Sequence, residues 1–277
     1  IWAPSVGVYV EAGADGRPFF ILPWNGQLLI GTTDERFEGD PGAATIDDRE
    51  LAYLTRETER VFPGAAGLAS RVLYTHTGVR PLPWQPRGKT AAITRRHVIR
   101  RHRAARGLWS VVGGKLTTHR ALAEDVLRTI RPELPRPIAD PLPTRTRPLP
   151  GALGAADRAA LLAEIGERFG DNNARRLWRV YGGVAREIAA LAADAELAAE
   201  VGGGVLAAEL VHAIQSEWAV TLEDLLQRRC MAGLGADFGL DVAPGAAAAL
   251  VRLGLWDDAR AEAELAAYRA FAVRHHA

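Results

Sequence analysis

The sequence is poor in the residues that build disulfides and metal sites. Its 277 residues include one cysteine, Cys230, which excludes an internal disulfide and every cysteine-rich metal site. The seven histidines show neither the HExxH nor the HxH spacing of a metal-binding pair. We therefore expect no metal centre, and the scarcity of cysteine is typical of a reducing compartment such as the cytoplasm.

A strong charge of one sign and a long apolar run are also missing. The formal net charge is +1, whereas duplex-binding proteins normally carry a large basic excess on one face, so nucleic acid is not expected as a partner. No stretch approaches the roughly 18 to 20 apolar residues of a membrane-spanning helix, so any membrane contact is expected to be peripheral. With 48% hydrophobic and 24% charged residues, the composition predicts a packed globular core.

The N-terminal end looks like neither a native start nor a signal peptide. The chain opens with Ile1, and no charged segment followed by an apolar segment comes after it. This pattern predicts a fragment of a longer protein.

Residues 1–130 combine strand-like and helical patterns and predict an α+β portion. Apolar runs flank Asn25 and Gly26, which predicts a hairpin because both central positions of a type I′ turn need positive φ. Helical spacing predicts helices over residues 47–62 and 117–130, and Pro63 with Gly64 ends the first of them. Further strands are expected at residues 8–10, 72–75, 91–94 and 108–112.

Residues 131–150 are expected to form the domain boundary. They carry seven prolines, which disfavour helix interiors and central strands and favour an extended, semi-rigid linker. Beyond them the apolar spacing is helical throughout, and Thr221 with Asp224 predicts a capping box at the start of one helix. The predicted organisation is an α+β portion over residues 1–130, a linker over 131–150 and a small all-α domain over 151–277.

A first candidate binding residue, Arg80, follows a predicted strand and lies between Val79 and Pro81. An arginine on such a stiff backbone can present its planar guanidinium to a phosphate or a carboxylate. The alternative interpretation is an ordinary surface arginine in a turn.

A second candidate lies between a predicted strand and a predicted helix, at Gly113, Gly114, Lys115, Leu116, Thr117 and Thr118. Glycines there allow backbone N–H groups to approach a ligand, and the helix N-terminus supplies partial positive charge. The segment is not a P-loop, because Trp109 and Leu116 stand at two of the required positions. Lys115 is one of two lysines in the chain, the other being Lys89, but a plain glycine-rich connection stays the alternative interpretation.

A third feature is a basic run that includes Arg95. Such a run is usually a solvated face. It could also steer an anionic substrate or meet anionic lipid headgroups. Its other arginines are Arg96, Arg100, Arg101, Arg103 and Arg106.

Taken in order, these motifs resemble the second half of the FAD-dependent (aerobic) glycerol-3-phosphate dehydrogenases. The carrying strings are Gly31-Thr32-Thr33-Asp34, Gly78-Val79-Arg80-Pro81-Leu82, Thr94-Arg95 and Gly113-Gly114-Lys115-Leu116-Thr117-Thr118. The helical part adds Leu222-Glu223-Asp224-Leu225-Leu226-Gln227-Arg228-Arg229, which resembles the C-terminal domain of the family. The resemblance covers nearly the whole chain.

The resemblance implies oxidation of sn-glycerol 3-phosphate to dihydroxyacetone phosphate, with hydride transfer to FAD and electrons passed to a quinone. By matching position, Arg80 and Lys115 would be catalytic, and Arg80, Arg95 and Lys115 would bind the substrate. The segment from Gly113 to Thr118 would contact the flavin. The resemblance further implies a cytoplasmic protein that could lie peripherally on the inner face of the cell membrane. It is also compatible with a homodimer.

Three departures from the family pattern shape the expectation for this chain. The G-x-G-x-x-G strand–turn–helix that cradles the FAD pyrophosphate does not occur in it, so we expect no tight FAD binding and no turnover by the isolated chain. Tyr9 stands where the family usually has histidine, and His119 stands where it usually has tyrosine. Two alternatives stay open, an amine or amino-acid oxidase-like flavoenzyme fragment and a non-catalytic remnant or interaction module.

Overall fold

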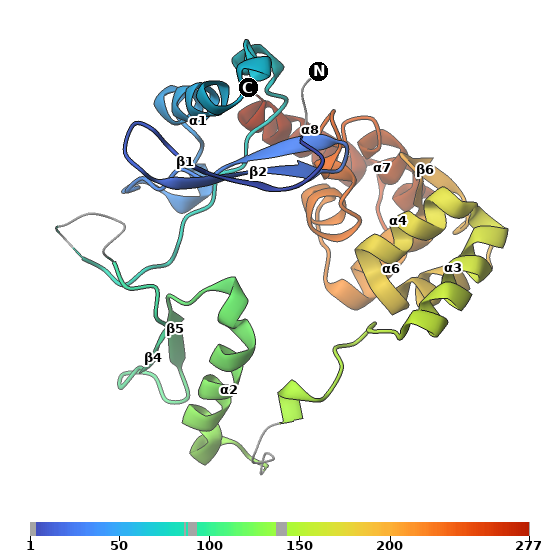
Figure 1. Cartoon of the computed structure of the whole chain (residues 1–277). Helices are drawn as coiled ribbons and strands as arrows, with labels where there is room; N and C mark the ends of the chain where they lie inside the picture. Colours follow the sequence, from blue (N-terminus) through green and yellow to red (C-terminus); the bar gives the residue numbers. More distant parts are fainter. Residues whose placement is uncertain (1–3, 86, 88–92, 137–142, 277) are drawn as a thin grey trace. The chain divides into compact units, whose positions relative to one another are not determined.

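The computed structural model describes residues 4–85, 87, 93–136 and 143–276, and its contacts form two compact units. We call them the large unit and the small unit. The large unit comprises Ile1–Thr32, Thr45–His76 and Pro150–Ala277, and the small unit comprises Thr33–Ala44 and Thr77–Leu149. Figure 1 colours the elements of both by sequence.

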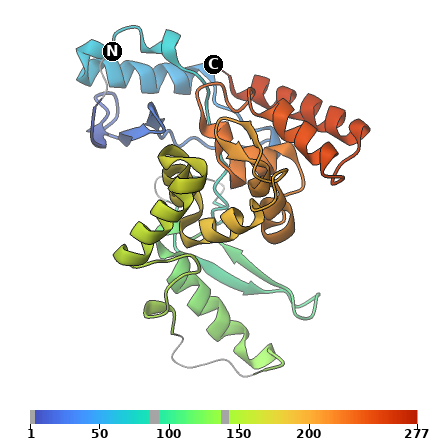
Figure 2. The ribbon, with the colours of Figure 1, turned by 90° about the vertical axis from the view of Figure 1, so that its right-hand side faces the viewer.

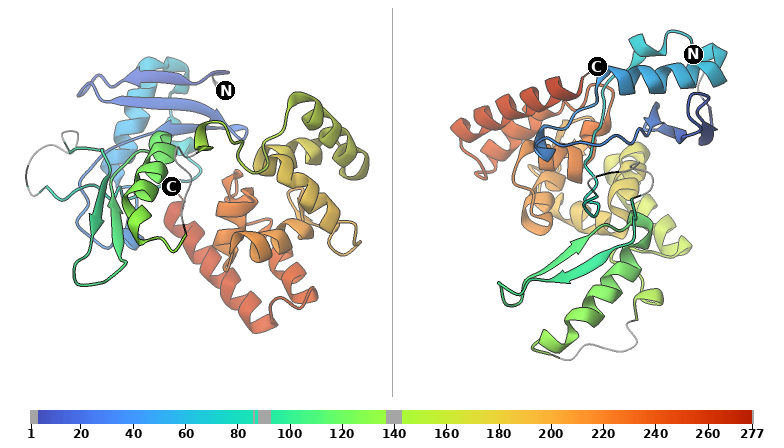
Figure 3. Two further views of the ribbon diagram at one scale, coloured as in Figure 1. Left: turned by 90° about the horizontal axis from the view of Figure 1, so that it is seen from below. Right: turned by 90° about the vertical axis from the view of Figure 1, so that its left-hand side faces the viewer.

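The large unit opens with a three-stranded antiparallel sheet in the order β1-β2-β3. Strands β2 and β3 meet at Asn25 and Gly26, whose φ angles of 47° and 75° confirm the predicted hairpin turn. The left view of Figure 3 shows the three strands side by side. Their bounds are β1 (Val8–Glu11), β2 (Pro18–Trp24) and β3 (Gln27–Gly31).

Helix α1 (Asp48–Val61) covers this sheet and confirms the helix predicted there. The Asp47 carboxylate accepts from the N–H of Glu50 and the Glu50 carboxylate accepts from the N–H of Asp47, a reciprocal capping box that starts the helix. Leu54 packs from the helix onto Phe19 and Ile21, which are both fully buried. Two 3₁₀ turns follow, η2 (Pro63–Ala65) and η3 (Leu68–Arg71).

The strand predicted at residues 72–75 is wrong. Tyr74 alone forms a β-bridge, and its partner is His276. His276 is the extended residue directly after the last helix, and His275 before it is still helical, so the pairing does not continue into a strand. The Thr75 N–H and hydroxyl both donate to the carbonyl of His275. This segment is thereby bound to the end of the helix rather than to a sheet.

The C-terminal part is mainly helical, as predicted, but it is not all-α. A short antiparallel pair, β6 (Glu200–Gly202) and β7 (Val205–Leu206), lies within it, at a glycine-rich turn whose positive φ angles suit a hairpin. Figure 2 shows the last helix of this part, coloured red, which leads to the C-terminal end of the chain. The helices are α3 (Ala155–Phe169), α4 (Asp171–Tyr181), α5 (Ala185–Leu191), α6 (Ala207–Glu217), α7 (Ala243–Arg252) and α8 (Asp258–His275), with 3₁₀ turns η8 (Gly182–Val184) and η10 (Ala232–Leu234).

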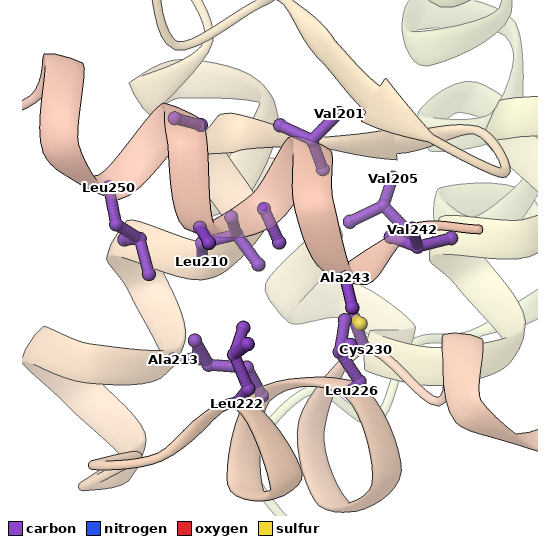
Figure 4. Packing of buried hydrophobic residues seen from close by; sticks show 14 of the residues in the cluster. Val201, Val205, Leu210, Ala213, Leu222, Leu226, Cys230, Val242, Ala243 and Leu250 are labelled. Carbon is purple, nitrogen blue, oxygen red and sulfur yellow. The ribbon is translucent and has the colours of Figure 1, made fainter. Parts of the chain in front are cut away.

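The helical part has its own hydrophobic core, built from residues between Val201 and Phe271. Figure 4 shows side chains of β6, β7, α6, α7 and the π-helical turn η9 (Asp224–Arg229) meeting in it, with Leu222 just before this turn and Cys230 just after it. The predicted capping box precedes η9, where Thr221 Oγ1 accepts from the Asp224 N–H at 3.0 Å and Asp224 accepts in return. A neighbouring cluster packs α3, α4 and α5 around Leu161, Ile165 and Leu177.

The small unit consists of a two-stranded hairpin and a helix. Strands β4 (Val98–Arg101) and β5 (Trp109–Val112) are antiparallel, and a 3₁₀ turn η5 (Leu116–Thr118) leads into α2 (His119–Ile130). His97 Nε2 lies 3.0 Å from an Asp125 oxygen of α2, and Trp109 Nε1 donates to Glu133. Three further 3₁₀ turns are η1 (Pro41–Ala43), η6 (Arg131–Glu133) and η7 (Pro143–Arg145).

Some predicted segments fall on residues that the structure does not describe. Residues 91–92 of the strand expected at 91–94 lie outside the described residues, and Ile93 and Thr94 are not in a strand. Lys89 and residues 137–142 of the proline-rich linker also lie outside them. Within the described ranges, no helix combines the length and the apolar character needed to cross a membrane.

The contacts group the chain differently from the predicted division at residues 131–150. The change from the small to the large unit does fall at Leu149 and Pro150. However, the N-terminal sheet and α1 belong with the C-terminal helices, since Gln27 Nε2 and the Tyr74 hydroxyl both donate to the carbonyl of Leu234. The predicted domain bounds therefore stay a prediction.

Candidate functional site

A cavity of about 300 Å³ in the small unit brings the predicted substrate-binding residues together. Arg80, Arg95 and Lys115 all line it, although they come from three separate segments. The other lining residues are Pro81, Leu82, Gly113, Gly114 and Leu116. We treat this cavity as the candidate site.

Two backbone hydrogen bonds hold the three segments in place. The N–H of Gly113 donates to the carbonyl of Pro81 at 2.9 Å, and the N–H of Gly114 donates to the carbonyl of Arg95 at 3.0 Å. Gly113 has a φ of 78°, and a Cβ there would lie 3.0 Å from the Arg96 carbonyl oxygen. Glycine is required because the turn after β5 needs both a left-handed backbone and a close approach.

The two arginines meet on one carboxylate, that of Asp34. Arg80 Nη1 lies 2.9 Å from Oδ1 of Asp34, and Arg95 Nη2 lies 3.0 Å from Oδ2. Sequence reasoning included Asp34 in the Gly31-Thr32-Thr33-Asp34 string but gave it no role. The negative charge of Asp34 could have indicated this role. An acidic residue in a motif that occurs together with two arginine-containing motifs can serve as their counter-ion.

Lys115 supplies a further positive charge to the cavity wall. It is the residue directly before η5, in an extended conformation with a φ of −125°. Among the described residues its ammonium group has no ion-pair partner. Three cationic side chains and one carboxylate leave the candidate site with a formal excess of two positive charges, which suits a dianion.

The backbone donors of the segment expected to contact the flavin fall into two groups. The N–H groups of Gly113 and Gly114 are engaged by the carbonyls of Pro81 and Arg95, and the N–H of Thr118 donates to the carbonyl of Lys115. These three donors already have acceptors within the chain, and the flavin contact expected for Gly113 to Thr118 stays a prediction. Over the part of the chain that the structure covers, the N–H groups of Leu116 and Thr117 have no acceptor, and they begin the helical segment η5–α2.

The two residues that depart from the family pattern lie in different units. His119 is the first residue of α2 in the small unit, with Nδ1 2.7 Å from the carbonyl oxygen of Leu116. Tyr9 belongs to β1 in the large unit, is 56% exposed, and its hydroxyl donates to a Glu11 carboxylate. Neither side chain lines the cavity.

None of the other arginines of the basic run lines the cavity: Arg96 precedes β4, and the rest lie on the hairpin. Arg100, Arg103 and Arg106 are exposed on β4 and the turn that follows it. Arg101 pairs with Glu133 at 2.8 Å and lies over the ring of Trp109. Apart from the residues left undescribed, the chain shows no group of three or more histidine, cysteine or acidic residues that could hold a metal ion.

Two family models match consecutive parts of the chain. One, described as FAD dependent oxidoreductase, matches residues 3–128, and the other, described as C-terminal domain of alpha-glycerophosphate oxidase, matches residues 142–261. A glycerol-3-phosphate dehydrogenase of Synechocystis sp. is 35% identical over 97% of this chain. The chain belongs to the family of FAD-dependent glycerol-3-phosphate dehydrogenases.

Other relatives are similar over most of this chain. The aerobic glycerol-3-phosphate dehydrogenase of Escherichia coli K12 is 31% identical over 82% of this chain, and the D-erythritol 1-phosphate dehydrogenase of Brucella abortus is 32% identical over 81%. The chain spans about half the length of the relatives that it matches, namely 50%, 46% and 46% of these three.

The fold agrees with that of a solved member. The structure of glycerol-3-phosphate dehydrogenase from Bacillus halodurans, complexed with FAD, superposes with a TM-score of 0.75 at 21% sequence identity. The match covers 98% of this chain and 54% of that chain. The predicted α+β class with a mainly helical C-terminal part is thereby confirmed.

Proposed function

We propose that this chain is part of an FAD-dependent dehydrogenase that oxidises sn-glycerol 3-phosphate to dihydroxyacetone phosphate. The observation that carries the proposal is the lining of one cavity by two guanidinium groups and one ammonium group, with a formal excess of two positive charges. A phosphate monoester is a dianion near neutral pH, so it matches this excess, whereas the single carboxylate of an amino acid does not. The family names of the relatives support the same substrate class.

In this proposal Arg80 and Arg95 hold the phosphate. Each guanidinium has five N–H donors in a planar fork, and Asp34 engages one nitrogen of each. The remaining donors can bind phosphate oxygens, and their fixed geometry orients the substrate as well as attracting it.

Lys115 is proposed to act at the C2 oxygen of the substrate. Oxidation removes a proton from this oxygen and a hydride from C2, so negative charge develops on the oxygen. An ammonium group held at the cavity wall stabilises that charge. Lys115 comes directly before η5 and has no counter-ion among the described side chains, which leaves its charge available for this task.

The residues after Lys115 fit the edge of a flavin. Leu116 is 88% exposed, and the N–H groups of Leu116 and Thr117 point out of the start of a helical segment, where partial positive charge favours an anionic ring. When bound, FAD supplies the hydride acceptor and passes the electrons on, for which we propose a quinone. We propose that the segment from Gly113 to Thr118 holds it, with the N–H groups of Leu116 and Thr117 facing the flavin edge.

We also propose that the protein contacts the inner face of the cell membrane peripherally. The turn after β4 exposes Arg103 and Arg106, and Leu108 at the end of this turn is 50% exposed. Basic residues with apolar neighbours favour an anionic lipid surface. Binding of the protein to vesicles with and without phosphatidylserine tests this contact, and equal binding to both would contradict it.

The decisive experiment is an anaerobic titration of the FAD-loaded, full-length protein with sn-glycerol 3-phosphate, followed by flavin absorbance. Bleaching is expected. Arg80→Ala should lower kcat/KM by about a hundredfold or more, as expected for loss of a charged group that acts on the bound substrate. Arg103→Ala, which removes the same charge from an exposed position outside the cavity, should leave it nearly unchanged.

The outcome separates this proposal from its rivals. A flavin that stays oxidised with glycerol 3-phosphate but bleaches with D-erythritol 1-phosphate would mean another polyol phosphate. Bleaching by amino acids alone would mean an oxidase of that class. Equal activities of Arg80→Ala and Arg103→Ala would contradict the role of the cavity.

A further inference from the structure

We propose that Asp34 is a positioning residue of the candidate site, whose carboxylate holds the guanidinium groups of Arg80 and Arg95 together before the anion arrives. The proposal rests on the proposed function and adds a residue to it. Asp34 does not touch the substrate in this account. It acts through the two arginines.

The geometry is that of a bridge. The two carboxylate oxygens are divided between the arginines, with Oδ1 2.9 Å from Arg80 and Oδ2 3.0 Å from Arg95. The carboxylate side chain is 28% exposed, and those of the arginines are 41% and 37% exposed. All three are thus partly covered, while each guanidinium keeps a face toward solvent and the cavity.

The segment that carries Asp34 is fixed next to the segment that carries Arg80. Arg36 Nη1 donates to the carbonyl of Gln85 at 2.8 Å, which joins the two stretches within the small unit. This contact joins the stretch that carries Asp34 to the rest of the small unit without involving Arg80 or Arg95.

Two positive groups on long, flexible side chains repel each other and lose rotamer freedom when they converge on one ligand. A resident carboxylate removes much of this cost in advance, because it neutralises part of the repulsion and orders both side chains before binding. The arginines then bind the phosphate through their remaining donors.

A purely electrostatic account predicts the opposite result. Without the Asp34 carboxylate, the formal excess of positive charge at the cavity rises by one, and attraction for a dianion should increase. The positioning account predicts weaker binding in spite of the added charge. The sign of the change therefore distinguishes the two.

The test is the affinity of oxidised, FAD-loaded, full-length protein for dihydroxyacetone phosphate, measured by calorimetry. The product binds without turnover, so the readout does not depend on activity. Asp34→Asn should weaken binding by about tenfold or more, whereas Asp34→Glu, which keeps the charge but moves it by one methylene, should weaken it by only about threefold. The matched control is Asp40→Asn. Asp40 lies in the same segment, and among described groups its carboxylate bonds only the N–H of Gly42, so the affinity of this variant should stay within about twofold of wild type.

Binding by Asp34→Asn that equals or exceeds that of the wild type overturns the proposal. If Asp34→Asn does not unfold cooperatively, Asp34→Glu alone decides, and an unchanged affinity in that variant overturns it. A wild-type protein that neither binds dihydroxyacetone phosphate nor bleaches with glycerol 3-phosphate overturns the proposed function and this inference together. Wild-type binding with an unaffected Asp34 variant overturns only the inference.

Discussion

Replacement of Glu209 by alanine should be among the most destabilising single changes in the helical part of the chain. Glu209 is fully buried on α6 and accepts from Arg176 Nη1, the Tyr181 hydroxyl and the N–H of Leu206 at 2.9, 2.9 and 2.8 Å. The Arg176 side chain on α4 is 23% exposed. Loss of the carboxylate leaves the guanidinium without its counter-ion and the Tyr181 phenol without its acceptor, in a place that water reaches poorly.

The magnitude follows from this burial. Removal of one partner of a buried ion pair typically costs about 3–5 kcal/mol, a large share of the roughly 5–15 kcal/mol by which domains are stable. For a unit of this size that cost lowers the melting temperature by about 6–20 °C. The change is measured by urea unfolding followed by far-ultraviolet circular dichroism, with equal slopes required for comparison.

Two comparison variants separate the ion pair from general damage to the helix. Arg175→Ala removes a neighbouring arginine that is exposed and 3.5 Å from Asp171, and it should change the free energy of unfolding by less than about 0.5 kcal/mol. The double variant Arg176→Met with Glu209→Leu replaces the pair by apolar groups and should recover most of the loss. A cost below about 1 kcal/mol for Glu209→Ala, or a double variant that is no more stable, would refute the reasoning.

Three further predictions concern other parts of the large unit. Burial, and secondly the charge of His275, lower the pKa of His76 below its usual 6.5. The stability that neutral His76 contributes is therefore fully present above pH 6.5 and is lost as the pH falls through the lowered pKa. His76→Phe should therefore flatten the loss of stability measured by urea unfolding from about pH 7 to 5, and an unchanged slope would contradict this. Burial raises the pKa of the Cys230 thiol to about 12, so this thiol should react with a disulfide reagent at pH 8 only after unfolding, and rapid reaction of the native protein would count against it. A Cβ at Gly245 would overlap the carbonyl oxygen of Val201, so Gly245→Ala should cost about 3 kcal/mol, and an unshifted urea midpoint would show that the backbone gives way.

Local chemistry was readable from the sequence. The Asn25-Gly26 turn, the helix that begins at Asp48 and the reciprocal capping of Thr221 and Asp224 all follow from contacts between near neighbours in the chain. Such contacts depend on residue type and spacing alone, which is why they were predicted correctly. The strand expected near Tyr74 was wrong because its outcome depended on a partner at the other end of the chain.

The candidate site shows the same division. The sequence by itself determined that Arg80, Arg95 and Lys115 are present on short, stiff segments with glycines at the turn before Lys115. Only the tertiary structure decided that these residues line one cavity, that Asp34 bridges two of them, and that the N–H groups of Gly113 and Gly114 bind the chain itself. The sequence shows which charged groups and hydrogen-bond donors are present. Which of them pair depends on the fold, because donor and acceptor atoms from distant segments must come within about 3 Å of each other.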